Sequence, residues 1–233
     1  RRHRRLWYLM PLVRSTCNPV GERSDANPQP LDPFISMDIT HIHISEENTM
    51  EQKGLVLINT GTGKGKTTAA LGTAVRAWGD GQRVLILQFI KGAWKYGELK
   101  AIETLGKADG RIEIRPMGDG FVFHNKKDPD NEERLAEKKE LARKAWDMVK
   151  EEVMSDRWDL VVLDEVNYAI HFGMLDTAEV AELIKARPAR LNMILTGRYA
   201  PQELIDLADT VTEMTLVKHA FQKGIRARKG IEF

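Results

Sequence analysis

The chain has 233 residues, of which 42% are hydrophobic and 30% charged, and its formal net charge is +1. This length is enough for one α/β domain with a full hydrophobic core and too short to promise two. The near-neutral charge gives no electrostatic reason to expect nucleic acid or a membrane as a partner. The single cysteine, Cys17, excludes an internal disulfide and a thiolate metal cluster. This fits a reducing compartment, and we expect a cytoplasmic protein.

Residues 1–50 differ in composition from the rest of the chain. Up to residue 21 there are five arginines and no acid, a pattern that resembles an organellar transit peptide. The alternative is translated upstream sequence, because Met37 and Met50 could each be a true start. We favour this second interpretation. Residues 1–50 are therefore treated as an N-terminal extension, and the folded domain is expected at 51–233.

Strand and helix patterns alternate through the remaining sequence. Short apolar runs, typical of strands buried on both faces of a sheet, occur at 55–58, 84–90, 112–114, 160–163, 191–195 and 211–216. Helical patterns lie between or after them at about 65–79, 97–106, 131–154, 176–187 and 201–208. Asp130 is a suitable N-cap for the third helix, and Pro201 suits the first turn of the last one. Alternation at this spacing predicts βαβ units and a mostly parallel sheet.

The sequence NTGTGKGKTT at residues 59–68 lies between the first predicted strand and the first predicted helix. A phosphate-binding loop is written G-x-x-x-x-G-K-[ST]. Gly65, Lys66 and Thr67 match its end, but the position of its first glycine is Thr60. A loop in this place directs backbone N–H groups and a helix N-terminus at phosphate. We therefore predict an α/β fold, a three-layer P-loop domain of the RecA-like type with a mostly parallel central sheet.

The residue types of this loop suit a nucleoside triphosphate. Glycines let the backbone approach phosphate closely, Lys66 can neutralise phosphate oxygens, and the Thr67 hydroxyl can hold Mg²⁺. A dinucleotide fingerprint that starts at Gly61 would require glycine where the chain has Lys66. The remaining alternative, a glycine-rich turn with chance lysines, is disfavoured by the strand before the loop and the helix after it.

The second half of the site is predicted in DLVVLDEVNY, residues 159–168, where four apolar residues precede Asp164 and Glu165. The carboxyl ends of strands in a parallel sheet form the ligand crevice, so this acidic pair is expected to face the loop. A carboxylate there can hold Mg²⁺, directly or through water. In hydrolytic P-loop ATPases the second acid commonly activates water, and the sequence leaves these two roles open.

Six sequence blocks in order resemble the P-loop class of cobalamin (corrinoid) adenosyltransferases, the cob(I)yrinic acid a,c-diamide adenosyltransferase family. The blocks are TGTGKGKTTAALGTAVRAWGDG, LQFIKGAW, VVLDEVNY, ILTGR, LIDLADTVTEM and VKHAFQKGIRARKGIEF. The resemblance runs from about residue 53 to the C-terminus. A loop without the first standard glycine is itself a mark of that family, so Thr60 is expected there.

The resemblance implies the alkylation of cobalt by ATP. Reduced cob(I)alamin, or a cobyric-acid-type precursor, attacks the 5′ carbon of the ribose, and intact triphosphate leaves. In the family, the loop grips the terminal phosphate and the ribose points toward cobalt. The resemblance also implies Mg²⁺, with Mn²⁺ as an alternative, a reduced flavoprotein as electron donor, and a homodimer. In relatives an N-terminal segment can cover the active site.

The resemblance also implies roles for individual residues. Lys66, Thr67 and Glu165 would be catalytic, and Thr67 and Glu165 would contact the metal with support from Asp164. Arg198 is expected to be a phosphate contact, and Arg76 a weaker one; the alternative for both is an ordinary surface arginine. The triphosphate would be held by the loop residues Gly61, Thr62, Gly63, Lys64, Gly65, Lys66, Thr67 and Thr68.

The resemblance further implies apolar side chains that displace the lower ligand of cob(II)alamin, which makes the cobalt reducible. The candidates lie in GDGFVF, residues 118–123. Phe121 matches the aromatic position of the family, whereas Phe123 stands where close relatives often have tryptophan. The alternative is that both phenylalanines belong to a small hydrophobic core.

Three other functions remain as alternatives. A RecA-like ATPase would use Asp164 and Glu165 for hydrolysis, a small-molecule kinase would need an arginine-rich lid, and a binding module would carry out no reaction. The nearest match to such a lid is the basic group Arg226, Arg228 and Lys229 in the C-terminal segment. The phosphate product of ATP distinguishes these functions.

Overall fold

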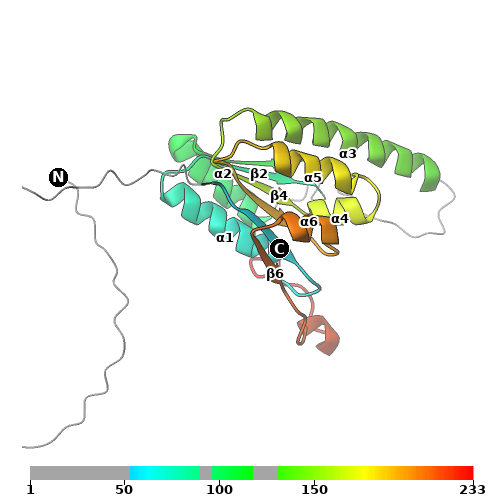
Figure 1. The fold of residues 1–233 in the computed structure, drawn as a ribbon. Helices are drawn as coiled ribbons and strands as arrows, with labels where there is room; N and C mark the ends of the chain where they lie inside the picture. Colours follow the sequence, from blue (N-terminus) through cyan, green and yellow to red (C-terminus); the bar gives the residue numbers. More distant parts are fainter. Residues whose placement is uncertain (1–52, 90–95, 118–130, 233) are drawn as a thin grey trace, which may run out of the picture. The chain divides into compact units, whose positions relative to one another are not determined.

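Six parallel strands form the centre of the computed structural model (Figure 1). The structure describes residues 53–89, 96–117 and 131–232, and for 131–138 the backbone alone. The order across the sheet is β3-β2-β4-β5-β1-β6. This confirms the predicted α/β fold with a mostly parallel sheet. The strands are β1 (Val56–Thr60), β2 (Val84–Gln88), β3 (Ile112–Pro116), β4 (Leu160–Asp164), β5 (Asn192–Thr196) and β6 (Thr210–Glu213).

Helices cover both faces of the sheet and make three layers (Figure 1). On one face, α1 (Lys66–Gly79) and α2 (Gly97–Asp109) pack over one hydrophobic core cluster. On the other face a second cluster lies beneath four helices. These are α3 (Asn131–Met154), α4 (Val166–His171), α5 (Thr177–Ala186) and α6 (Gln202–Leu207). All described residues belong to one compact unit, Asn48–Phe233.

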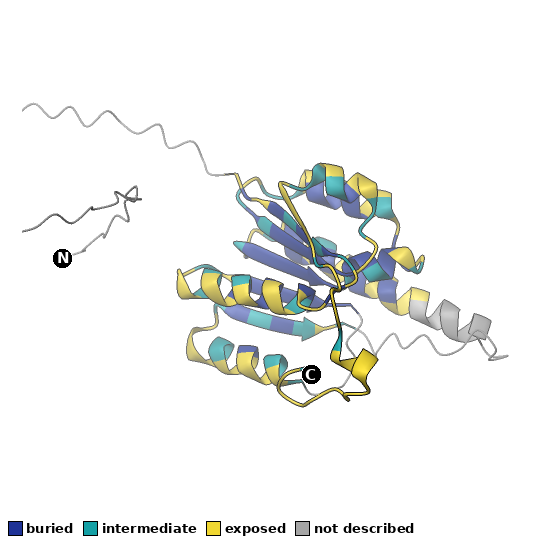
Figure 2. Ribbon diagram, turned by 90° about the horizontal axis from the view of Figure 1, so that it is seen from below, coloured by how far each residue is buried: buried dark blue, intermediate teal, exposed yellow. Residues whose placement is uncertain are grey.

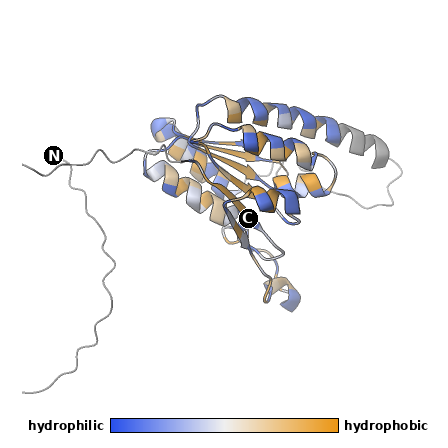
Figure 3. Ribbon diagram, in the orientation of Figure 1, coloured by the Kyte–Doolittle hydropathy of each residue, from blue (hydrophilic) through white to orange (hydrophobic). Residues whose placement is uncertain are grey.

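The central strands are buried because helices cover both of their faces. Every residue of β2 and β4 is buried, and Figures 2 and 3 show apolar, buried strands between helices whose outer sides are polar and exposed. Full burial of one such aliphatic side chain contributes about 1.5–3 kcal/mol. Within the described ranges, none of the helices has both the length and the apolar character needed to cross a bilayer.

The last strand departs from the prediction. The apolar run 211–216 predicted a strand buried on both faces, but β6 ends at Glu213 and all four of its residues are exposed. The reason is its position, because β6 is the edge strand and pairs with β1 alone. The prediction of burial was therefore wrong for this strand.

The helices also differ from the prediction at their ends. Helix α4 was not predicted, because its six residues follow directly after the acidic pair and are too few to show a period. Pro201 is the N-cap of α6, one residue before the helix begins. Helix α5 begins after Asp176, whose side chain accepts a hydrogen bond from the Ala178 N–H at 2.9 Å. The predicted N-cap Asp130 lies outside the described residues.

A charged network joins the amino ends of three strands. The Asp159 carboxylate, next to β4, accepts hydrogen bonds from the Arg83 backbone N–H at 2.8 Å, from Arg83 Nε at 3.1 Å and from Arg190 at 2.5 Å. The hydrogen bond from the Arg83 side chain lowers the pKa of Asp159 from its ordinary value of 3.8 to about 2. Because the folded-state pKa is depressed, the stabilisation is present above the ordinary value and is lost as pH falls through about 2.

We expect Asp159→Asn to lower the free energy of unfolding by about 1–2 kcal/mol at pH 7, discounted for partial exposure of the pair. The difference from the wild type should shrink below pH 4 and approach zero near pH 2. Urea unfolding at several pH values measures it. Asp147→Asn is the control, since Asp147 pairs with Lys150 on the exposed side of α3, and its loss should change the free energy of unfolding much less because solvent screens the pair. An equal decrease in the free energy of unfolding for both variants would contradict a special stabilising role of Asp159.

Candidate active site

The phosphate loop, residues 61–65, connects the end of β1 to the first turn of α1. Gly61 and Gly65 have φ angles of +94° and +108°, in the left-handed region that favours glycine. Gly63 is needed for space, because a Cβ added there would lie 2.6 Å from the carbonyl oxygen of Met214. That oxygen accepts a hydrogen bond from the Gly63 N–H at 2.6 Å. The glycines thus shape the loop and hold it against the segment that follows β6.

Thr60 occupies the place of the first standard glycine without strain. It is the last residue of β1, so its backbone is extended and needs no glycine. Its carbonyl oxygen accepts a hydrogen bond from the Met214 N–H at 2.9 Å, and its hydroxyl accepts one from the Ala200 N–H at 3.4 Å. The sharp turn starts one residue later, at Gly61. Thr60 therefore anchors the loop to the segments that follow β5 and β6.

Lys66 is buried inside the loop that it follows. Its ammonium group donates to the carbonyl oxygens of Gly61 at 3.0 Å and Gly63 at 2.6 Å. Burial lowers the pKa of Lys66 below its ordinary value of 10.5; the nearby charge of Glu165 opposes this shift and that of Arg198 adds to it. A positive group that is short of water and held by neutral carbonyls has a strong preference for an anionic partner.

Asp164 joins three elements at the carboxyl edge of the sheet. Its buried carboxylate accepts hydrogen bonds from the Thr67 hydroxyl of α1 at 2.8 Å and from the Thr196 hydroxyl of β5 at 2.7 Å. Gln88, at the end of β2, donates its amide N–H to the second carboxylate oxygen at 3.0 Å. The Thr67 proton is thereby directed at Asp164, and the oxygen of that hydroxyl keeps lone pairs with which it can bind a cation.

Glu165 lies next to this network in an unusual backbone conformation. Its φ angle is +63°, which is uncommon for a residue other than glycine, and its N–H donates to the Thr196 hydroxyl at 2.9 Å. A Cβ added to Gly197 would lie 3.3 Å from Glu165 Oε2, so the carboxylate sits against the turn after β5. Such conformations concentrate at functional sites. Glu165, after β4, and Arg198, in the turn after β5, thus lie at the carboxyl edge of the sheet, close enough to Lys66 for their charges to affect its pKa.

The oxygen donors around Thr67 suit a Mg²⁺ ion that is shared between the protein and substrate phosphates, rather than a metal held by side chains alone. The hydroxyl of Thr67 and the carboxylates of Asp164 and Glu165 are oxygen donors, which Mg²⁺ prefers. In the described part of the chain there is no group of three or more His, Cys, Asp or Glu residues that could hold a metal by themselves. Mg²⁺ usually binds through one or two carboxylates together with water and substrate phosphates, and this arrangement meets that requirement.

Three other predicted residues lie beside Lys66, and a fourth lies far from it. Thr62, Lys64 and Thr68 are exposed on the loop and on the first turn of α1, beside Lys66. Arg76 lies in the last turn of α1 and is exposed, about 15 Å along the helix from Lys66. It is therefore not grouped with the loop, and its contact with ATP stays a prediction.

The remaining predicted pair, Phe121 and Phe123, lies outside the described residues. Two functional neighbours were missed, Gln88 and Thr196, which hold Asp164 from β2 and β5. Each is a polar residue that ends an otherwise largely apolar buried strand, and that signal could have identified them.

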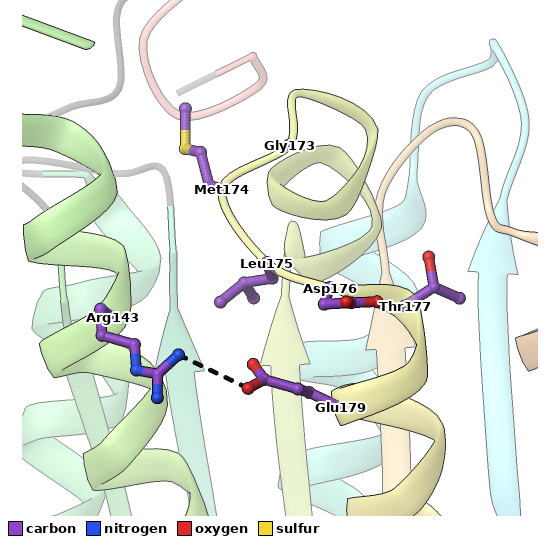
Figure 4. A pocket seen from close by; sticks show the side chains of 7 residues that line it. All are labelled: Arg143, Gly173, Met174, Leu175, Asp176, Thr177 and Glu179. Carbon is purple, nitrogen blue, oxygen red and sulfur yellow. Dashed lines mark hydrogen bonds and ion pairs between the residues drawn. The ribbon is translucent and has the colours of Figure 1, made fainter. Parts of the chain in front are cut away.

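A separate cavity of about 520 Å³ lies between α3 and the connection from α4 to α5 (Figure 4). Arg143 of α3 points across it to Glu179, at 3.4 Å. Asp176 on its wall is the N-cap of α5. These charged groups have partners within the protein, so the cavity does not offer the unmatched positive charge that a phosphate group requires.

Comparison with known proteins identifies the family. The family model described as ATP:corrinoid adenosyltransferase BtuR/CobO/CobP matches residues 52–233. The chain belongs to the ATP:corrinoid adenosyltransferases. It is 40% identical over 185 residues to a corrinoid adenosyltransferase of Sinorhizobium sp, covering 78% of this chain and 82% of that one. It is also 39% identical over 184 residues to the corrinoid adenosyltransferase CobA of Salmonella typhimurium, covering 78% and 87%.

Membership in this family confirms the predicted enzyme class, an ATP:corrinoid adenosyltransferase that acts in cobalamin biosynthesis or salvage. Among solved structures, this adenosyltransferase is similar to a KaiC-like protein, PH0186, from Pyrococcus horikoshii OT3, with 18% identity and a TM-score of 0.40 over 72% of this chain and 75% of that one. It is also similar to the RadB recombinase, with 18% identity and a TM-score of 0.43 over 71% and 77%.

Proposed function

We propose that this site transfers the 5′-deoxyadenosyl group of ATP to the cobalt of a reduced, cob(I) corrinoid and releases inorganic triphosphate. The electron pair of cobalt(I) forms the new bond to C5′. The bond between C5′ and its oxygen breaks, and that oxygen leaves with the bonding pair as part of the triphosphate. The observation that carries the proposal is the altered loop, in which Lys64 and Lys66 follow an extended Thr60 in a chain of this family.

The charge of the leaving group explains the chemistry of the loop. Triphosphate departs with high negative charge, so positive groups and N–H donors that face it lower the barrier. Lys66 and Lys64 would supply the charge, the loop amides would supply donors, and Arg198 would add a third cation from the turn after β5. The short distances from Lys66 to the loop carbonyls support this, because phosphate oxygens can replace neutral acceptors at the same place.

Thr67 and Glu165 are proposed to hold Mg²⁺, with Mn²⁺ as an alternative. Asp164 would act by orienting the Thr67 hydroxyl, since it accepts the proton of that hydroxyl at 2.8 Å. A bound Mg²⁺ would neutralise charge on the triphosphate group. The protein's own contribution is the placement of its oxygen donors on α1 and after β4, beside Lys66.

The corrin side of the reaction rests on the family resemblance. Phe121 and Phe123 are proposed to displace the lower ligand of cob(II)alamin, so that a reduced flavoprotein can supply the electron. The corrinoid would be complete cobalamin or a cobyric-acid-type precursor, and the working form would be a homodimer.

The phosphate product tests the proposal. Incubated with ATP, Mg²⁺ and chemically reduced cob(I)alamin, the protein should form adenosylcobalamin and triphosphate in equal amounts. Absorbance follows the corrinoid, and anion chromatography separates triphosphate from ADP and phosphate. ADP with free phosphate as the main products would favour hydrolysis, and binding without any product would favour a nucleotide-gated module. A reaction without corrinoid measures background hydrolysis.

A further inference from the structure

The segment after β6 forms one wall of the phosphate loop. This C-terminal arm, residues 214–232, continues from β6 and contains one short 3₁₀ helix, Ala220–Lys223 (Figure 1, red). Its first residue, Met214, accepts the N–H of Gly63 and leaves no room for a side chain at Gly61 or Gly63. The arm is therefore part of the site's construction, although the sequence motifs of the loop do not include it.

Basic residues outnumber acidic ones in the arm, and its single acidic residue lies at the phosphate loop. The only acidic residue between 214 and 232 is Glu232, and it forms an ion pair with Lys64. The basic residues of the arm are Lys218, Lys223, Arg226, Arg228 and Lys229. A basic arm beside a triphosphate site is expected from electrostatics. A carboxylate at the loop lysine opposes that expectation, and so it requires a reason.

The backbone places Glu232 for this contact. The N–H groups of Ile231 and Glu232 both donate to the carbonyl oxygen of Arg228, at 3.1 Å and 2.8 Å, and Gly230 has a φ angle of +80°. This turn brings the chain back toward Lys64. The Glu232 side chain is 20% exposed and that of Lys64 is 52% exposed, so the acidic side chain is largely covered while the lysine side chain is still half open to solvent.

The two side chains also line a cavity between the loop and the arm. It has a volume of about 300 Å³, and Lys64, Lys218, His219 and Glu232 contribute its charged and titratable groups. A cavity that opens at the loop lysine can admit the end of a phosphate chain. An anion that enters it approaches Lys64 while Lys64 is paired with Glu232, so the anion and the carboxylate compete for the same ammonium group.

We propose that Glu232 is an internal counter-ion of the phosphate loop, which competes with the triphosphate group for Lys64 and promotes release of inorganic triphosphate. The inference rests on the proposed role of Lys64 as a triphosphate contact. The attraction of Lys64 for an anion grows with the charge of that anion, and free triphosphate carries one more ionisable oxygen than the triphosphate of ATP. By occupying Lys64, Glu232 therefore weakens product binding more than substrate binding, and it acts on the anion through Lys64.

The expected change in triphosphate affinity is small, because the ion pair between Lys64 and Glu232 is partly exposed to solvent. An ion pair with a half-exposed lysine is weak. Glu232→Gln should therefore tighten the binding of inorganic triphosphate by about two- to fivefold and that of ATP by a smaller factor. The gain should decrease in high salt, because mobile ions screen exposed charges. In turnover, triphosphate should become a stronger product inhibitor by the same factor.

The test is calorimetric titration of the full chain with inorganic triphosphate, in the wild type, Glu232→Gln, Lys64→Gln and the double variant. We expect the gain from Glu232→Gln to disappear when Lys64 is already glutamine. Glu213→Gln is the matched control, because it removes a negative charge at the end of β6 without removing the partner of Lys64. Thermal unfolding of each variant shows that the fold is kept.

Three outcomes would overturn the proposal: an unchanged or weaker affinity in Glu232→Gln, the same gain in the Lys64→Gln background, or an equal gain in Glu213→Gln. Weaker binding would mean that Glu232 orients Lys64 toward phosphate instead of competing for it. These results are separate from the proposed reaction, since the wild type would still form adenosylcobalamin and triphosphate. If it formed ADP instead, the reaction would be wrong while the binding data could still support the counter-ion.

Discussion

Lys66→Ala is expected to lower kcat/KM for adenosyl transfer by about 10- to 150-fold. A charge-assisted hydrogen bond to phosphate contributes about 1.5–3 kcal/mol, and each 1.4 kcal/mol is a factor of ten. Lys66 is the group best placed for this contact, because its ammonium group is buried within the loop and bonded to the carbonyl oxygens of Gly61 and Gly63. Steady-state kinetics with chemically reduced cob(I)alamin measures the loss.

The neighbouring lysine provides the comparison. Lys64 is exposed and paired with Glu232, so its contact with phosphate is better screened and Lys64→Ala should cost less than Lys66→Ala. Stability separates a catalytic role of Lys66 from a structural one. Burial disfavours the charged form of Lys66, so Lys66→Met, which keeps most of the side-chain volume, should unfold at the same temperature as the wild type or higher. A large fall in the unfolding temperature would show that Lys66 mainly holds the loop together.

The sequence was sufficient for the layers, the strand–helix alternation and the phosphate loop, because each depends on residues close together in the chain. Buried strands such as β2 and β4 appear as continuous apolar runs, and the loop has its own spacing. The exposure of β6 could not be predicted in this way, since the same apolar run suits a central strand and an edge strand. Strand order decides between them, and it is a property of the whole sheet.

Several contacts of the site that join distant parts of the chain were not predicted. Gln88, Thr196 and Asp164 come from three strands and meet only because β2, β4 and β5 are neighbours in the sheet. The contact of Met214 with Gly63 and the pairing of Glu232 with Lys64 join the end of the chain to its first loop. Local propensity carries no information on such pairs.

The acidic pair after β4 is expected to divide into a structural and a metal-binding carboxylate. Asp164→Ala would leave the hydroxyls of Thr67 and Thr196 and the amide of Gln88 without their buried acceptor. Each such loss costs about 1–3 kcal/mol. We therefore expect a reduction of about 3 kcal/mol or more in the free energy of unfolding, together with a loss of activity that added Mg²⁺ does not restore.

Glu165→Gln should behave differently. Its side chain lies at the edge of the network, against Gly197, and within the electrostatic influence of Lys66. The glutamine variant keeps the shape and removes the charge, so the free energy of unfolding should change by about 0.5 kcal/mol or less, as for substitutions that leave packing intact. Activity should be low at a Mg²⁺ concentration that saturates the wild type. It should recover in part as Mg²⁺ is raised, because a carboxylate ligand has been replaced by a weaker neutral one.

The pair of results decides which acid holds the metal. Activity is titrated against Mg²⁺ for the wild type, Asp164→Asn and Glu165→Gln, and urea unfolding of the same preparations is measured in parallel. Asparagine at position 164 can still accept one hydrogen bond from Thr67 or Thr196, so this variant keeps more of its fold than the alanine variant and permits the titration. An unchanged Mg²⁺ titration for Glu165→Gln, with a shifted one for Asp164→Asn, would transfer the metal contact to Asp164. In that case the Thr67 hydroxyl and the Asp164 carboxylate would bind the ion together, and the strained backbone of Glu165 would serve the turn into α4.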